Sequence, residues 1–342
     1  MPTAGAHILV YPFLTSGHII PLLDLTHRLI TRGLNVTVII TPNNSSLLDS
    51  LISSHPSSSL QTLILPTPSW SATSSNRLIS MMRGLRELHY PALRTWFRSH
   101  PSPPVAILSD FFLGWTQQLA SEVGVPRVVF SPSGALALSV SYALWTDLPK
   151  SEDPNNQNFQ LSFPKIPNCP TYPWFQISRF YRECKEGDPD WELYRSCFLE
   201  DKASWGVVLN SATEVERDYI DHMKKDAGHD RVWAVGPMLP PDDDLAGSTS
   251  RGGSAAVQSH EVLKWLDSHQ DNSVVYVCFG SRQNIPESTK LAQLFAESVD
   301  GTGPQRSKAK ELKEAVMKAV SKGGSSDRDL DAFVRSINEL ES

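Results

Sequence analysis

From the start of the chain, short apolar runs typical of strands alternate with segments in which apolar residues recur at helical spacing. Residues 7–13 (HILVYPF) form a short apolar run bounded by turn residues, which predicts a buried strand. Apolar residues then recur near helical spacing from Ile20 to Ile30, and Gly33 is placed to end that helix. The β-branched stretch Asn35–Ile40 (NVTVII) predicts a second strand. Strand, helix and strand in this order make a βαβ unit, the building block of parallel sheets.

The same alternation continues to about residue 236. It predicts further strands at residues 62–65, 105–108, 127–130, 205–209 and 232–235, and helices at residues 114–123 and 213–225. Residues 149–173 are rich in proline and asparagine, which predicts an irregular excursion. Residues 1–236 are therefore expected to form one α/β domain, a Rossmann-like, doubly wound parallel sheet.

Residues 237–259 have the composition of a linker, with several prolines, a run of three aspartates at 242–244, and then glycines and serines. Low hydrophobicity and many helix breakers argue against packed structure there. Domains are usually joined by such segments, so a second domain is expected to follow.

Residues 260–342 predict only part of that second domain. A short helix at 261–267 precedes one clear strand at 273–279 (SVVYVCF). The remaining predictions are all helices, at residues 286–299, at residues 309–320 and after Ser326, which has capping-box spacing with Asp329. Because one strand cannot form a sheet, we expect the middle of the domain to be missing, with the break near residues 282–285.

The bulk composition is that of a globular protein, with 40% hydrophobic and 20% charged residues and a formal net charge of -6. A mildly acidic chain without a long basic run is a poor candidate for binding nucleic acid. Because no segment reaches about 18 unbroken apolar residues, we expect no membrane span. The four cysteines include no C-x-x-C pair, which favours reduced thiols in a cytoplasmic protein over disulfides or a metal site.

Two titratable residues are predicted at the carboxyl edge of the sheet. His18 follows the first strand, where a histidine can deprotonate a substrate hydroxyl. Its position is equally compatible with a histidine that lies near a helix start and has no functional role. Asp110 follows the strand at 105–108 and could accept a hydrogen bond from His18. The alternative for Asp110, or for Ser109 before it, is to cap the following helix.

Other catalytic signatures are absent from the sequence. There is no G-x-S-x-G elbow, no P-loop and no G-x-G-x-x-G after the first strand. Gly280 and Ser281 follow the strand at 273–279, so their backbone N–H groups could contact a phosphate. A glycine and a serine after a strand are more often only a turn.

Several of these segments together resemble the plant family-1 UDP-glycosyltransferases. The matching segments, in the order of the family, are residues 7–21 (HILVYPFLTSGHIIP), 109–115 (SDFFLGW), 205–216 (WGVVLNSATEVE), 232–237 (VWAVGP) and 265–281 (WLDSHQDNSVVYVCFGS). Residues 131–144 and 163–174 look closest to the branch that acts on flavonols and small phenolics. The resemblance covers about residues 7–283 and resumes at 285–342, which looks like the extreme C-terminus of the family.

The resemblance implies the GT-B fold, two facing Rossmann-like domains, and a UDP-dependent glycosyltransferase in which the UDP-sugar is a co-substrate and no metal or other cofactor takes part. His18 then corresponds to the general base on a phenolic acceptor hydroxyl, and Asp110 supports it. The hydroxyl attacks the anomeric carbon with inversion. Gly17 is expected to let the backbone turn before His18, and Ser281, with Gly280, to contact the donor phosphates.

One departure from the family pattern matters. The donor-binding box, roughly W-x-P-Q…H-x-G-W-N-S…D/E-Q, is absent, and Gly114-Trp115 is the only Gly-Trp pair in the sequence. An internal deletion explains both this absence and the lone second-domain strand. We therefore expect weakened UDP-sugar binding and a truncated, impaired enzyme. The alternatives are a non-catalytic protein that binds an acceptor or a partner, and a product that aggregates through exposed sheet edges.

Overall fold

The computed structural model describes residues 5–69, 76–153, 155–183, 185–239, 257, 259–271, 273–274, 276 and 304–341. The strands are β1 His7–Tyr11, β2 Asn35–Ile40, β3 Leu60–Ile64, β4 Ala106–Asp110, β5 Arg127–Ser131, β6 Gln160–Leu161, β7 Tyr172–Pro173, β8 Gly206–Leu209 and β9 Val232–Ala234. The α-helices are α1 Ser16–Thr31, α2 Asp49–Ser54, α3 Arg77–Ser99, α4 Thr116–Val123, α5 Ala135–Asp147, α6 Arg179–Glu183, α7 Pro189–Lys202, α8 Thr213–Ala227, α9 Ser259–Asp267, α11 Pro304–Val320 and α12 Ser325–Asn338. Short 3-10 helices are η1 Pro42–Leu48, η2 Phe111–Leu113 and η3 Trp174–Gln176.

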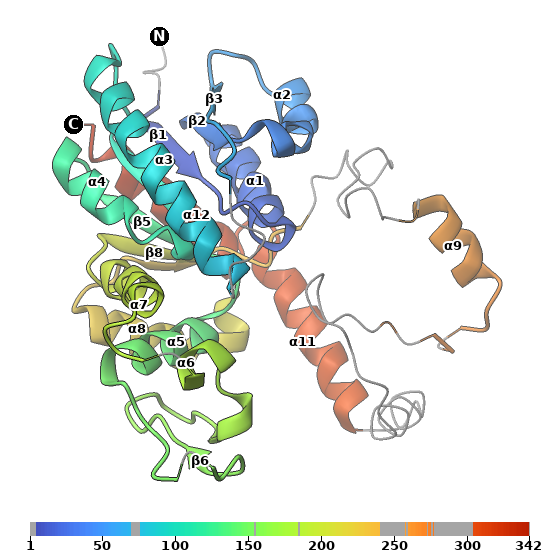
Figure 1. The fold of residues 1–342 in the computed structure, drawn as a ribbon. Helices are drawn as coiled ribbons and strands as arrows, with labels where there is room; N and C mark the ends of the chain where they lie inside the picture. Colours follow the sequence, from blue (N-terminus) through green and yellow to red (C-terminus); the bar gives the residue numbers. More distant parts are fainter. Residues whose placement is uncertain are drawn as a thin grey trace.

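In the described part of the chain, seven strands form one parallel sheet in the order β3-β2-β1-β4-β5-β8-β9 (Figure 1). From β1 the chain adds β2 and β3 on one side and then returns to add β4, β5, β8 and β9 on the other. The strand order therefore reverses between β1 and β4, the position where open α/β sheets leave a crevice at the carboxyl ends of their strands. The predicted α/β class with a doubly wound parallel sheet is confirmed.

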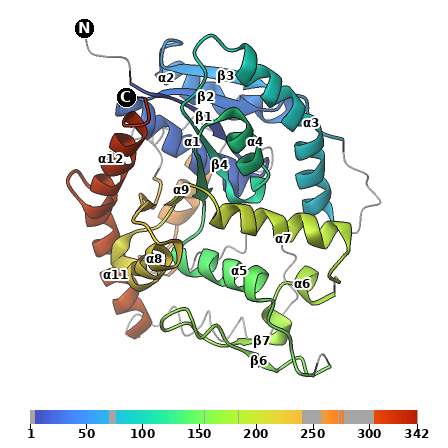
Figure 2. The same ribbon diagram turned by 90° about the vertical axis from the view of Figure 1, so that its left-hand side faces the viewer.

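Both faces of the sheet are buried, which explains why its strands read as continuous apolar runs. Along β1, Ile8 and Val10 join the apolar cluster of α1, whereas Leu9 and Tyr11 join the cluster of α3 and α4. Figure 2 shows α11 and α12 on one side of the molecule and α3 and α7 on the other. The helix α1 ends where predicted, because Gly33 takes a φ of +93° that other residues rarely adopt.

The helix α12 packs against the sheet of residues 5–239, although it comes last in the chain. Phe333 is fully buried in the same apolar cluster as Ile8 and Val10 of β1. The Asn338 Oδ1 atom accepts a hydrogen bond from the Ala6 backbone N at 3.0 Å. This helix therefore lies with the first domain, and the expectation that 260–342 forms one remnant of the second domain does not hold for it. Local helical spacing carries no information about which sheet a helix covers.

The predicted capping box at the start of α12 is wrong. The N-cap residue is Gly324, and no side chain caps the helix. Instead, the Ser326 hydroxyl donates to the backbone O of Gly236 at 2.7 Å, and the Asp329 Oδ2 atom accepts from the backbone N of Ala234 at 2.9 Å. The two residues with capping-box spacing therefore tie the helix to the carboxyl end of β9.

Some predictions lie outside the described residues. They are most of the strand at 273–279, the break at 282–285, the helix at 286–299, and most of the linker at 237–259. The described helices α9 and α11 agree with the predictions at 261–267 and 309–320. The predicted excursion at 149–173 contains a two-residue antiparallel pair, β6 with β7.

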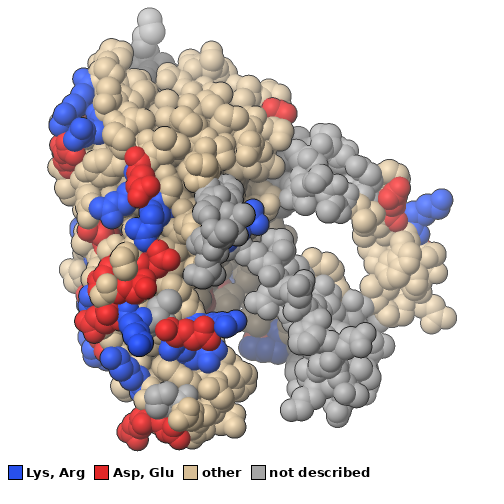
Figure 3. All heavy atoms as spheres, in the orientation of Figure 1, with Lys and Arg blue, Asp and Glu red and all other residues tan. Residues whose placement is uncertain are grey.

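Charged side chains of both signs are interspersed on the face in Figure 3. Exposed ion pairs such as Arg98–Glu122, with a distance of 2.8 Å, join neighbouring helices. None of the helices in the described ranges is long and apolar enough to cross a bilayer.

Candidate functional site

His18 lies at the point where the strand order reverses. It is the third residue of α1, which begins directly after β1 and its short loop, and its backbone N donates to the backbone O of Thr15 at 2.8 Å. The side chain is 18% exposed, so solvent or a ligand can reach it. Gly17 is not needed for a turn: it lies inside α1, its φ is not in the left-handed region, and a Cβ there would contact nothing within 4 Å. That expectation is wrong.

Asp110 is the last residue of β4, the strand next to β1, and its side chain is fully buried. Its Oδ2 atom lies 2.8 Å from Nδ1 of His18. Its Oδ1 atom accepts a hydrogen bond from the backbone N of Phe112 at 2.9 Å and so caps η2. The two interpretations left open by the sequence are therefore both correct, because each carboxylate oxygen has its own partner.

The Asp110 contact selects the tautomer of the neutral histidine ring. A carboxylate oxygen accepts hydrogen bonds, so Nδ1 of His18 is the donor in this contact, and in the neutral ring the lone pair then lies on Nε2. A histidine held in this tautomer can accept a proton at Nε2, and the nearby carboxylate stabilises the imidazolium that results. The pair can therefore act as a general base.

Aromatic rings surround His18. The imidazole stacks on Phe111 and Phe112, with ring centroids 5.6 and 5.1 Å away and interplanar angles of 29° and 26°. Phe13 meets it edge-on at 5.6 Å. This role was not predicted from the sequence, although the pair of phenylalanines directly after Asp110 is a signal for it. The surroundings suit a flat aromatic ligand better than a polar one.

A buried arginine holds the strand end that carries Asp110. Arg127 donates from Nε to the Ser109 hydroxyl at 2.8 Å and from a terminal nitrogen to the Asp110 backbone O at 3.2 Å. Its other terminal nitrogen lies 2.7 Å from Oδ1 of Asp201, and neither side chain is exposed. No sequence pattern predicts this pair, because its members are 74 residues apart.

The remaining predicted site residues, Gly280 and Ser281, lie outside the described residues. Within the described ranges, no group of three or more His, Cys, Asp or Glu side chains is arranged to hold a metal ion.

Two plant enzymes match most of the chain in sequence. It is 50% identical over 289 residues to UDP-glycosyltransferase 89B2 of Stevia rebaudiana, covering 82% of this chain and 60% of that protein. It is 43% identical over 330 residues to flavonol 3-O-glucosyltransferase UGT89B1 of Arabidopsis thaliana, covering 93% of this chain and 66% of that protein. The chain thus spans 60 to 66% of the length of these relatives. No protein-family model matches it.

Solved structures of plant UDP-glycosyltransferases share the fold. UGT89C1 of Arabidopsis thaliana in complex with UDP-L-rhamnose superposes with a TM-score of 0.74 at 25% identity, covering 98% of this chain and 100% of the other. The same enzyme with quercetin gives a TM-score of 0.72. UGT71G1 of Medicago truncatula with UDP-glucose gives 0.79 at 17% identity, which concerns the fold alone. The likeness identifies the sheet as part of a GT-B fold.

Proposed function

Because this chain is a homologue of plant UDP-glycosyltransferases, we propose that it derives from an enzyme that transfers a sugar from a UDP-sugar to a hydroxyl of a small phenolic acceptor. The observation that carries this proposal is the 2.8 Å contact between Nδ1 of His18 and Oδ2 of Asp110 at the strand-order reversal. The names of relatives that act on flavonols, and the neighbour that binds quercetin, support the acceptor class.

In the proposed reaction, Nε2 of His18 removes the proton of the acceptor hydroxyl. The oxygen then attacks the anomeric carbon while the bond from that carbon to UDP breaks, and UDP leaves with the electron pair. The configuration of the anomeric carbon inverts. Asp110 stabilises the imidazolium formed in this step. The UDP-sugar is the only co-substrate that these steps require.

The acceptor side of the proposed site is supported by the rings around His18. Phe111 and Phe112 are half-buried and stack on the imidazole, so a flat acceptor can pack against aromatic surfaces while its hydroxyl approaches Nε2. Positioning of this kind supplies a large part of the rate of a two-substrate reaction.

The donor side is where we propose that this chain is impaired. Gly280 and Ser281 are the proposed contacts to the donor phosphates, but the sequence lacks the box that would hold the uracil, ribose and sugar. The chain spans 60 to 66% of the length of its sequence relatives, which fits the absence of this box. Without donor contacts, the charge on the departing UDP would lack stabilisation.

The missing box favours a second candidate function, a non-catalytic protein that binds the phenolic acceptor or a protein partner. The two candidates share the acceptor site and differ only in donor binding. A binding measurement with each substrate alone therefore separates them.

The test is a calorimetric titration of the purified chain with UDP and, in parallel, with quercetin. Full-length UDP-glycosyltransferase 89B2 of Stevia rebaudiana is the matched control. We expect quercetin to bind the chain and UDP to bind at least about 100-fold more weakly than to the control, equivalent to the loss of roughly 2.7 kcal/mol of binding free energy. Comparable UDP affinity would disprove donor-site loss. Absence of quercetin binding would disprove the acceptor site.

A further inference from the structure

A series of hydrogen bonds between buried side chains begins at Arg127 and ends beside the candidate site. Nε of Arg127 donates to the Ser109 hydroxyl at 2.8 Å, and the hydroxyl oxygens of Ser109 and Thr116 lie 2.7 Å apart. The Thr116 hydroxyl donates to the backbone O of Leu113 at 2.6 Å. The side chains of Arg127, Ser109 and Thr116 are all fully buried. These three side chains and the Leu113 carbonyl are called here the Arg127 network.

The hydrogen bonds of this network run in one direction. The guanidinium of Arg127 can only donate, so the Ser109 oxygen accepts from it. The backbone carbonyl of Leu113 can only accept, so the single hydroxyl proton of Thr116 is used there. Ser109 therefore donates its own proton to Thr116. Because each hydroxyl both accepts and donates, the loss of either one disconnects Leu113 from Arg127.

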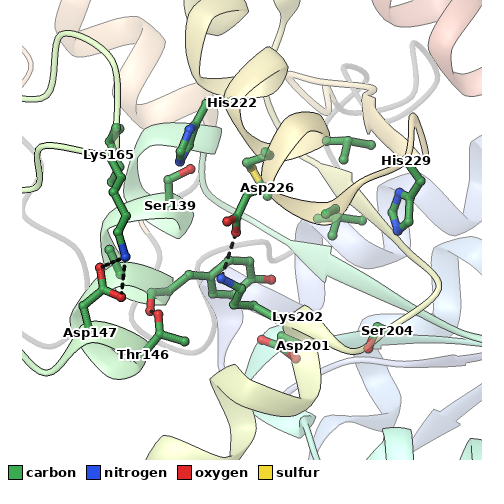
Figure 4. A pocket seen from close by; sticks show the side chains of 17 residues that line it. Ser139, Thr146, Asp147, Lys165, Asp201, Lys202, Ser204, His222, Asp226 and His229 are labelled. Carbon is green, nitrogen blue, oxygen red and sulfur yellow. Dashed lines mark hydrogen bonds and ion pairs between the residues drawn. The ribbon is translucent and has the colours of Figure 1, made fainter.

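The arginine end of the network is fixed to the end of α7. A terminal nitrogen of Arg127 donates to Oδ1 of Asp201 at 2.7 Å and to the Ser204 hydroxyl at 3.0 Å. Asp201 and Ser204 also line a cavity of about 150 Å³ to which α5, α7 and α8 contribute residues. Figure 4 shows Lys202 beside this cavity pointing toward Asp226 of α8, with a distance of 2.8 Å. The end of α7 that holds Arg127 is therefore tied to α8.

The other end of the network holds η2, the turn Phe111–Leu113. The backbone O of Leu113, at the end of this turn, accepts the bond from Thr116. At the start of the turn, Oδ1 of Asp110 accepts from the backbone N of Phe112 at 2.9 Å. The backbone O of Asp110 accepts from Arg127 itself at 3.2 Å. Both ends of η2 are therefore attached to the same guanidinium, one directly and one through two hydroxyls.

Three groups that contact the His18 ring belong to this held segment. Oδ2 of Asp110 lies 2.8 Å from Nδ1 of His18, and the rings of Phe111 and Phe112 stack on the imidazole. A shift of the segment therefore moves the hydrogen-bond partner and the aromatic wall of the histidine together. Groups of this kind function only when the residues behind them hold them in place.

We propose that Ser109 and Thr116 are positioning residues of the candidate site, which transmit the fixed position of Arg127 to Asp110 and η2. Both are fully buried, so their effect passes through Asp110 and η2 and not through contact with a substrate. This inference rests on the proposed function, because the site that they position is the proposed acceptor site. Its consequence is that the tautomer of His18 depends on the hydroxyl of Thr116.

The test compares two substitutions of one residue. Thr116→Val removes the hydroxyl from a side chain of nearly the same shape, whereas Thr116→Ser keeps the hydroxyl. The matched control is Thr26→Val on α1. Thr26 is also fully buried and donates to a backbone carbonyl, that of Leu22, at 2.7 Å, but it does not belong to the Arg127 network.

Two measurements are made on the full chain, with melting curves to check that each variant folds. Imidazole ¹⁵N NMR signals show which nitrogen of the neutral His18 ring carries the proton, and the signals of His18 are assigned by their loss in His18→Ala. Calorimetric titration with quercetin gives the affinity for a flat phenolic acceptor. The NMR measurement needs no ligand and no activity.

In wild type, we expect the neutral His18 ring to carry its proton on Nδ1. Thr116→Val should give a mixture with the Nε2 tautomer and weaken quercetin binding about tenfold, the size of effect expected for one lost hydrogen bond. Thr116→Ser and Thr26→Val should keep the wild-type tautomer and bind quercetin within about twofold of wild type. If Thr116→Val does not fold, Ser109→Ala breaks the network one link earlier and replaces it in both measurements.

Three results would overturn the proposal. They are a wild-type tautomer in Thr116→Val, an equal change of tautomer in Thr26→Val, and a Thr116→Ser variant that behaves like Thr116→Val. Absence of quercetin binding to wild type would instead count against the proposed acceptor site, and the tautomer of His18 would still decide the role of the network. The failure of one proposal is therefore distinguished from the failure of the other.

Discussion

Buried polar groups differ in their hydrogen bonding at the two ends of the parallel strands, called here the carboxyl edge and the amino edge of the sheet. At the carboxyl edge, both oxygens of Asp110 have partners within the chain, and the group left available is Nε2 of His18. At the amino edge, Oδ2 of Asp201 and the hydroxyls of Ser139 and Tyr142 have no hydrogen-bond partner among the described residues. Fully bonded groups hold one side chain in position for chemistry, whereas unpaired buried groups lower the stability of the fold.

One residue contacts both edges. Arg127 bonds to the backbone O of Asp110 and to Oδ1 of Asp201, so one guanidinium holds the strand end at one site and the carboxylate at the other. The planar guanidinium has five donors and suits such a position, whereas a lysine could not reach both groups in a fixed geometry. The comparison predicts that removing His18 affects chemistry alone and that removing Arg127 affects the whole domain.

The largest effect is expected for His18→Ala in any transfer that the chain catalyses. Loss of a general base lowers the rate by about 100- to 10,000-fold, because the acceptor hydroxyl is no longer deprotonated during attack. The rate of glucosylation of quercetin by UDP-glucose measures this effect. His27→Ala, on the same helix, is the matched control and should retain the wild-type rate. Full activity of His18→Ala would refute the base assignment.

A smaller but still large effect on stability is expected for Arg127→Met. At pH 8, where the wild-type Asp201 is ionised, the substitution removes the counter-charge of a buried carboxylate, which lowers the free energy of unfolding by about 3–5 kcal/mol. Urea denaturation measures the loss. The control is Arg98→Met, which breaks an exposed ion pair of similar length, 2.8 Å against 2.7 Å, and should lower stability by about 1 kcal/mol or less. Equal losses would show that burial of the Arg127 pair is unimportant.

The paired residues at the carboxyl edge were largely predictable from the sequence, and the buried polar residues at the amino edge were not. His18 and Asp110 each follow an apolar run, and parallel strands bring such positions to one edge regardless of loop length. Ser139, Tyr142 and Asp201 lie on helices, where their hydrophobic neighbours give no sign of a cavity. Only the packing of α5, α7 and α8 brings them together, and packing depends on contacts far apart in the chain.

The end of the chain illustrates the same limit. The spacing of Leu330, Phe333 and Ile337 predicted an amphipathic helix, and α12 is one. The sequence did not indicate that its apolar face packs on β9, where the rings of Phe333 and Trp233 lie 5.1 Å apart. Nor did it indicate that Ser326 and Asp329 bond to β9 and its following loop rather than to their own helix. Periodicity identifies a helix and its buried face, but the partner of that face depends on tertiary structure.

The smallest expected effect is the pH dependence of the free energy of unfolding, which tests the ionisation of Asp201 at the amino edge. Burial raises the pKa of Asp201 from 3.8 to about 7, against the lowering effect of Arg127 and with a further rise from the carboxylates of Asp110 and Glu200. Between these values the folded protein holds this proton more tightly than the unfolded chain. The stabilisation is therefore complete below about pH 4 and is lost as the pH rises through about 7.

Urea unfolding at pH 5 and pH 8 measures this loss for wild type and for Asp201→Asn, whose side chain cannot ionise. We expect the free energy of unfolding to fall more steeply with pH in wild type than in the variant. The difference between the two slopes isolates Asp201, because all other titrating groups are common to both proteins. Equal slopes would mean that Asp201 stays ionised in the folded protein throughout this range, with Arg127 outweighing burial.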